Sequence, residues 1–67
     1  MAKYLITKIN GDDKFKIFLL GHNISIGTIF TLDNAPKSSG LAIITVFHKK
    51  LSFRKSDFEK IEFKIEE

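Results

Sequence analysis

Cysteine and tryptophan are absent from this 67-residue chain, which contains one methionine, one proline and one tyrosine. The lack of cysteine excludes disulfides, thiolate zinc sites, iron–sulfur clusters and cysteine nucleophiles. A chain of this length makes one small domain, which buries only about 60% of the surface exposed in the unfolded state. Stability must come from apolar burial, and 43% hydrophobic residues, seven of them phenylalanine, are adequate. We expect residues 1–67 to form a single domain.

Long hydrophobic segments are also missing. The longest uninterrupted apolar runs, Ile17–Leu20 and Leu41–Ile44, have four residues each, whereas a membrane-spanning helix needs about 20. Lys8 interrupts the first apolar stretch before it reaches the length of a signal-peptide core. We therefore expect a cytoplasmic protein without direct membrane insertion.

Sequence features of enzymes are scarce. No serine lies in a nucleophile elbow or at a spacing that pairs it with a histidine. Gly27 and Gly40 are isolated, and no Gly-Lys-Ser/Thr motif follows them, so a phosphate-binding loop is excluded. We expect neither enzymatic activity nor a cofactor.

Metal ligands are few and dispersed. A transition-metal site would need both histidines, His22 and His48, with a carboxylate such as Asp33 or Asp57. The histidines lie in separate expected turns and lack the His-x-His or His-x-x-x-His spacing. We expect no dedicated metal site and at most weak transition-metal binding.

The first third of the chain predicts a strand followed by a short helix. Tyr4–Ile9 is rich in strand-forming residues, and residues 10–13 form a turn whose aspartates can cap a helix. The apolar residues Phe15, Phe18 and Leu19 then follow at i, i+3 and i+4, which predicts one buried helical face.

The helix is expected to run to about His22 and to end at Asn23, because asparagine tolerates the left-handed conformation that often follows a helix. After Gly27 the pattern changes to strands. Thr28–Asp33 predicts a strand, and residues 34–40 are rich in turn formers. Leu41–Phe47 is apolar at both alternating sets of positions, which predicts a central strand covered on both sides.

The last third predicts two strands separated by a helical turn. His48 and Lys49 make a tight connection into the strand 50–53. Residues 54–60 include Ser56 and Glu59 at capping-box spacing and predict one helical or 3₁₀ turn. Ile61–Glu66 alternates cleanly, with Ile61, Phe63 and Ile65 inward.

Five short strands with turn signals between them predict a mainly β fold, a five-stranded SH3-like antiparallel barrel. One short N-terminal helix and a short helical turn before the last strand complete it. The expected core comprises Phe15, Phe18, Leu19, Phe30, Leu32, Ile44, Val46, Leu51, Phe53, Ile61 and Phe63.

Two segments carry a resemblance to a known family. Leu51–Phe63 fits a pattern of the form isLRk-x-dA-x-x-I-x-V. Residues 22–28 align with a Leu-Gly-Leu-x-Pro-Gly-like turn after a helix, where His22, Asn23 and Ile26 replace Leu, Gly and Pro. With these motifs the chain resembles, from residue 17 to 63, the ferrous-iron transport A (FeoA) family of small SH3-like barrels.

The resemblance implies an accessory or regulatory protein of ferrous-iron uptake that binds the cytosolic, G-protein-bearing part of a FeoB-like permease. An apolar turn that cannot fully bury its residues often forms a contact patch. For Ile26, a role in covering the barrel is the favoured interpretation. The expected partner-binding residues are Leu20, His22, Ile24 and Ile26, with Lys49, Lys50, Arg54 and Lys55 as steering charges. Self-association is also possible.

Other binding functions have less support in the sequence. Without tryptophan and with one tyrosine, the chain lacks the aromatic groove that takes proline-rich SH3 ligands. A nucleic-acid-binding barrel would need exposed phenylalanines beside Lys49, Lys50 and Arg54, whereas Phe53 and Phe63 are expected inside, so no nucleic-acid partner is expected. The chain also lacks a helix-turn-helix, so it could be only a loose relative of the SH3-like domain of metal-dependent repressors. For the cluster of basic residues, solvated surface is the favoured interpretation.

Overall fold

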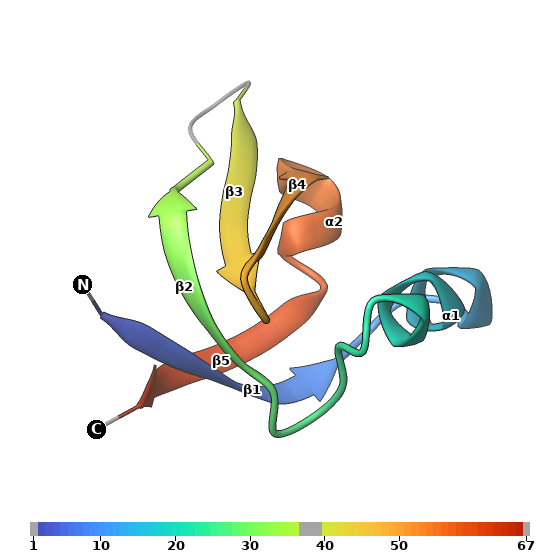
Figure 1. Cartoon of the computed structure of the whole chain (residues 1–67). Coiled ribbons are helices and arrows are strands. Elements are labelled where there is room, and N and C mark those ends of the chain that lie inside the picture. Colours follow the sequence, from blue (N-terminus) through green and yellow to red (C-terminus); the bar gives the residue numbers. More distant parts are fainter. Residues whose placement is uncertain (1, 37–39, 67) are drawn as a thin grey trace.

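The computed structural model describes residues 2–36 and 40–66. Five strands form one antiparallel sheet in the order β4-β3-β2-β1-β5. In chain order the elements are β1 (Lys3–Ile9), α1 (Asp13–Gly21), β2 (Ile29–Asn34), β3 (Leu41–Val46), β4 (Lys49–Arg54), α2 (Lys55–Phe58) and β5 (Ile61–Glu66) (Figure 1). This mainly β architecture with two short helices confirms the expected SH3-like barrel. Residues 37–39 of the expected loop 34–40 lie outside the described residues.

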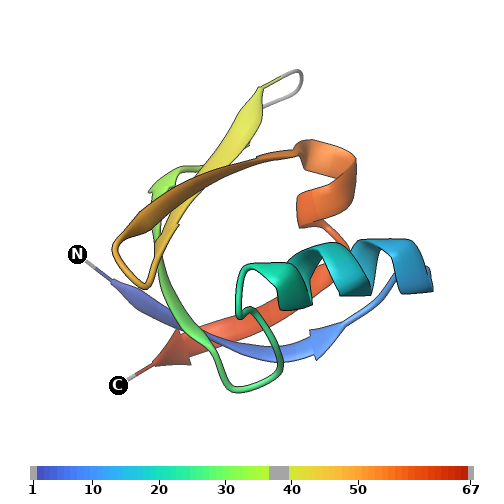
Figure 2. The same cartoon turned by 45° about the vertical axis from the view of Figure 1, so that its right-hand side comes forward.

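The first and last strands of the chain are neighbours in the sheet. β1 and β5 pair from Lys3↔Glu66 to Ile9↔Ile61, with an irregularity between Ile6 and Lys8. Both helices lie on the open side of the curled sheet (Figure 2). In the part of the chain that the structure covers, neither helix has the length and apolar character needed to cross a bilayer.

The core draws on every strand and both helices. Its buried apolar residues are Ile6, Leu19, Ile24, Phe30, Ala42, Ile44, Val46, Phe53, Phe58 and Ile61, with Tyr4, Ile9, Phe15, Leu32, Leu51 and Phe63 partly buried against them. Phe30 is the largest fully buried side chain, and its ring lies edge-on to Phe63 at a centroid distance of 5.3 Å. The inward orientation expected for Phe53 and Phe63 is confirmed, and ten of the eleven expected core residues belong to this set. The buried residues Ile6, Ile24, Ala42 and Phe58 and the partly buried Tyr4 and Ile9 were not predicted.

Three expectations about burial are wrong. Phe18 is 48% exposed, because α1 packs into the core chiefly through Leu19 and leaves Phe18 at the edge of the barrel. Ile65 is 62% exposed, since it lies at the end of β5, opposite Tyr4 near the start of β1. β3 alternates between buried and less buried residues, and Leu41 is 49% exposed, so this strand is not covered on both sides.

The predicted helical turn exists as α2, but its cap differs from the prediction. The N-cap residue is Arg54 and no side chain caps the helix, so Ser56 lies inside the first turn. This start places Phe58 in the core at 7% exposure. Burial of one phenylalanine is worth more than a capping-box hydrogen bond, so the core determines where α2 begins.

Candidate functional site

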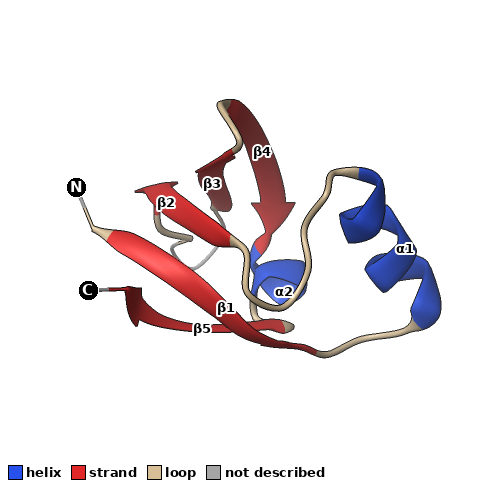
Figure 3. Cartoon of the chain, turned by 60° about the horizontal axis from the view of Figure 1, so that its bottom comes forward, coloured by secondary structure: helices blue, strands red, loops and turns tan. Residues whose placement is uncertain are grey.

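The end of α1 forms a Schellman motif, in which Asn23 has the left-handed conformation expected from the sequence. Asn23 has φ 62° and donates its backbone N–H to the Leu20 carbonyl at 2.9 Å. Ile24 donates to the Leu19 carbonyl, also at 2.9 Å. These two bonds satisfy carbonyl groups that a helix end leaves free. They turn the chain back from α1 toward β2 (Figure 3).

The Schellman motif places Ile24 in the core. Ile24 is 1% exposed and Leu19 is 0% exposed, and such motifs commonly bring these two helix-end positions together in an apolar contact. The expectation that Ile24 contacts a partner is therefore wrong, because its side chain is not accessible. Leu20, one residue further along α1 than Leu19, is 61% exposed.

A second tight turn follows directly and exposes Ile26. The Thr28 N–H donates to the Ser25 carbonyl at 3.1 Å, and the Thr28 hydroxyl accepts the Ser25 N–H at 3.0 Å. Gly27 has φ 96°, as a type II turn requires at its third position. Ile26 occupies the second position, where the family pattern has proline, and is 66% exposed. It does not cover the barrel, contrary to expectation.

Two shallow hollows meet at this turn. The first, of about 370 Å³, is lined by Ile9, Lys16, Leu20, Ile24, Ser25 and Ile26. The second, of about 480 Å³, is lined by Asn23, Ser25, Ile26, Gly27, Thr28, Ile29 and Phe47. The two hollows adjoin at Ser25 and Ile26, which line both. Their large exposed apolar side chains are Leu20, Ile26, Ile29 and Phe47, which we call the turn surface.

Phe47 reaches the turn surface from the β3–β4 hairpin. Val46 pairs with Lys49, so Phe47 and His48 alone make the connection, with φ 50° and 65°. Two-residue hairpin turns of this kind favour asparagine and glycine, and a bulky residue at positive φ is unusual. The sequence pattern predicts Phe47 as the last residue of the strand, whereas β3 ends at Val46 and Phe47 lies in the turn. Alternation along β3 was the available signal, because an inward Val46 predicts an outward Phe47.

The four basic residues expected to steer a partner do not form one patch beside the turn surface. Lys49 and Lys50 begin β4, next to the hairpin, and the Lys50 Nζ lies 3.7 Å from Asp33 Oδ2. Arg54 ends the strand and Lys55 begins α2. Five residue steps along a strand separate Lys49 from Arg54 by about 17 Å. Along the chain, only Lys49 and Lys50 are close to Phe47 and therefore to the turn surface.

The two histidines have separate environments. His22 is half-buried, and its ring packs edge-on against Phe18 at a centroid distance of 4.9 Å. His48 is exposed in the hairpin turn. Within residues 2–36 and 40–66, no cluster of three or more His, Cys, Asp or Glu side chains is arranged to hold a metal ion.

The described structure therefore offers exposed apolar side chains on a hydrogen-bonded backbone, an arrangement suited to protein binding. No protein-family model matches the chain, and no curated protein matches it significantly.

Proposed function

We propose that this chain is a small cytoplasmic accessory protein of ferrous-iron uptake. It acts by binding the cytosolic part of a FeoB-like permease through the turn surface. The surface itself supports a binding function, because exposed apolar side chains that lie together commonly mark protein contacts. The choice of partner rests on the resemblance of residues 17–63 to the FeoA family.

The observation that carries the binding function is the position of Phe47. A non-glycine residue in the left-handed region costs about 1–2 kcal/mol. The same hairpin could form with asparagine and glycine at less cost. Nevertheless, Phe47 keeps a ring that is 58% exposed at the rim of the turn surface. A ring that contributes little to the core and sits in an unfavourable conformation is best explained by a contact outside the barrel.

The backbone beneath the turn surface favours tight binding. Leu20 belongs to the Schellman motif and Ile26 follows it by two residues, and the side chains of the motif's Leu19 and Ile24 are buried. The Ser25–Thr28 hydrogen bonds fix the tip that carries Ile26. Side chains presented on an ordered backbone lose less conformational entropy on binding, so apolar anchors of this kind contribute much of the affinity.

The nucleic-acid alternative has less support. Base stacking needs exposed rings on the strand face beside the lysines. Phe53 is 4% exposed and Phe63 is half-buried within the aromatic cluster of Phe30 and Phe58. These two rings are part of the core, and the exposed Phe47 near Lys49 lies in the hairpin turn and not on a strand face, so a protein partner is the function proposed.

The test is a binding measurement between the purified protein and the cytosolic domain of the ferrous-iron permease from the same organism. Leu20→Glu and Phe47→Asn are each expected to weaken binding at least about tenfold, as for an anchor at the centre of an interface. The matched control is Ile17→Glu. Ile17 is 66% exposed on the same helix but lines neither hollow, so its variant should bind like the wild type.

Circular dichroism establishes that each variant is folded. Folded Leu20→Glu and Phe47→Asn proteins with wild-type affinity would contradict the proposal. An equal loss with Ile17→Glu would also contradict it, because the effect would then follow from added charge alone. Light scattering of the free protein tests whether a second copy occupies the turn surface instead.

A further inference from the structure

β4 is an edge strand with one row of free backbone groups. The sheet order places β4 at one end, and no other strand of the described structure pairs with its outer side. Val46 and Lys49 flank the two-residue turn and form a hydrogen-bonded pair, after which bonded and non-bonded pairs alternate. By this alternation, Lys50 and Ser52 direct their N–H and C=O groups away from β3. Arg54 offers only its N–H there, because as the N-cap of α2 its carbonyl accepts the first hydrogen bond of that helix.

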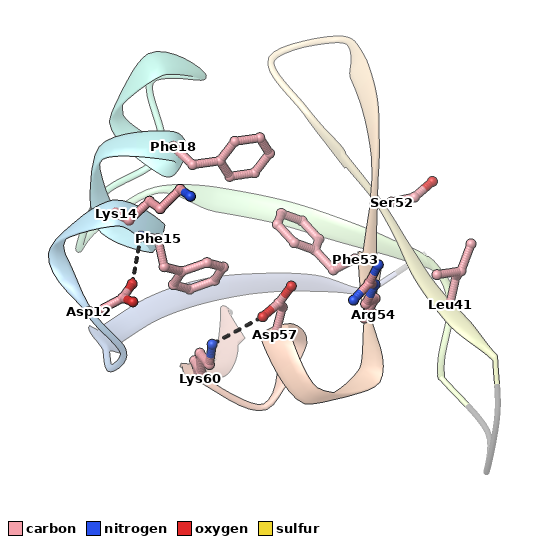
Figure 4. Close-up of a pocket in the computed structure, with 10 residues that line it drawn as sticks. All are labelled: Asp12, Lys14, Phe15, Phe18, Leu41, Ser52, Phe53, Arg54, Asp57 and Lys60. Atoms are coloured by element: carbon pink, nitrogen blue, oxygen red, sulfur yellow. Dashed lines mark hydrogen bonds and ion pairs between the residues drawn. The ribbon is translucent and has the colours of Figure 1, made fainter.

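A groove runs along this free edge, between β4 and α1. It has a volume of about 470 Å³ and is lined by Asp12, Lys14, Phe15, Phe18, Leu41, Ser52, Phe53, Arg54, Asp57 and Lys60. Phe15 and Phe18 point from α1 toward β4 (Figure 4). The Phe18 ring meets Phe53 edge-on, with centroids 6.3 Å apart, and remains 48% exposed. The groove therefore has an apolar wall opposite unpaired backbone groups.

The charges that remain available in the groove are positive. The Asp12 carboxylate accepts the Phe15 N–H at 2.9 Å as the N-cap of α1. Asp57 pairs with Lys60 at 3.1 Å. Lys14 and Arg54 stand on opposite walls, and neither forms an ion pair with any residue that the structure describes. The two aspartates thus already have partners, whereas two cations do not.

We propose that this groove binds an extended, acidic segment of a partner protein, which adds to β4 as a further strand. The segment bonds to the outward backbone groups of Lys50 and Ser52 and to the Arg54 N–H. One apolar side chain enters between Phe18 and β4, and its acidic neighbours lie near Arg54 and Lys14. Strand addition of this kind takes affinity from the main chain and specificity from alternate side chains.

The positive charges of β4 favour an acidic strand over a second copy of this chain as the occupant of the groove. β4 carries Lys49, Lys50 and Arg54, so two copies of this edge would set like charges against each other. An acidic strand in the same place would meet opposite charges. The groove is distinct from the turn surface, because Lys14 and Phe18 face it whereas Lys16 and Leu20 line a hollow on the other side of α1. The inference does not depend on the proposed function.

The probe is a fluorescent heptapeptide with blocked ends, in which glutamates alternate with valines around a central phenylalanine. Fluorescence anisotropy at low salt should show saturable binding, which weakens as salt screens the charges. A peptide methylated at the backbone nitrogens that face β4 should not bind, because it cannot pair as a strand. A peptide with lysine in place of glutamate should bind at least about tenfold more weakly.

Arg54→Glu should weaken binding of the glutamate peptide about tenfold or more, since it replaces an attraction with a repulsion. The matched control Ile17→Glu should bind like the wild type, because Ile17 is exposed on α1 and lines neither the groove nor the hollows of the turn surface. If Arg54→Glu does not fold, amide hydrogen exchange of the wild type decides the question. Saturating peptide should then protect the Ser52 and Arg54 amides.

Absence of binding at millimolar protein would overturn the proposal. Equal binding of the methylated peptide, or binding without protection of these amides, would also overturn it, since the contact would be electrostatic only. Concentration-dependent protection of the same amides without peptide would show that a second copy occupies the edge, which the proposal excludes.

Discussion

Replacing Ile24 with alanine tests whether the end of α1 is part of the core. Ile24 is 1% exposed, and the substitution removes three buried carbon atoms. At about 0.8 kcal/mol per buried methylene, the transfer contribution is roughly 2.5 kcal/mol, and an unfilled cavity raises the total to about 3–5 kcal/mol. A domain of this length has a free energy of unfolding of roughly 3–10 kcal/mol, so this loss is a large share of it.

Urea denaturation followed by circular dichroism measures the effect. For a small domain with an m-value of about 1 kcal/mol/M, the midpoint should fall by about 3 M or the variant should be unfolded in buffer. Leu20→Ala is the matched control, because Leu20 is 61% exposed and its loss should stay below about 1 kcal/mol. A stable Ile24→Ala protein with weakened partner binding would refute the reasoning and return Ile24 to the binding surface.

Three further predictions concern the helix end, the core and metal binding. Asn23→Ala should lower the free energy of unfolding by about 1 kcal/mol, because Asn23 has φ 62°, a left-handed conformation that alanine adopts only at a cost. Asn23→Gly should be neutral or stabilising, since glycine adopts it freely. Equal urea midpoints for the two variants would contradict this prediction. Phe53→Ala should cost about 3–5 kcal/mol, and a folded variant with an unchanged thermal midpoint would place Phe53 outside the core. Purified protein should bind iron(II) no more tightly than any histidine-bearing surface. Anaerobic calorimetry that finds one stoichiometric micromolar site, lost on mutation of His22 or His48, would disprove that expectation.

Local signals predicted much of the fold. Alternation in Ile61–Glu66 and the turn residues between the strands were sufficient for a mainly β architecture, and all five expected strands are present. Asp12 caps α1 and Asn23 ends it, as expected from their side chains. These features depend on residues close together in the chain, so they can be derived from sequence spacing.

Exposure at the candidate site was predicted less well. Ile24 and Ile26 lie two residues apart and have the same side chain, yet one is buried and the other is 66% exposed. The difference arises because the Schellman motif turns Ile24 toward the core, whereas the Ser25–Thr28 turn directs Ile26 outward. Composition and periodicity do not contain this information, since neither residue belongs to a regular element.

Hydrophobic periodicity and capping chemistry are local, so the residue pattern was sufficient to predict the fold class, the ends of α1 and the inward orientation of Phe53, Ile61 and Phe63. Which apolar side chains meet at the surface depends instead on tertiary packing. Phe47 joins Ile26 through the β3–β4 hairpin, and Phe18 faces Phe53 because α1 lies on the open side of the sheet. Both surfaces combine segments distant in sequence, and their proximity follows from strand pairing and packing.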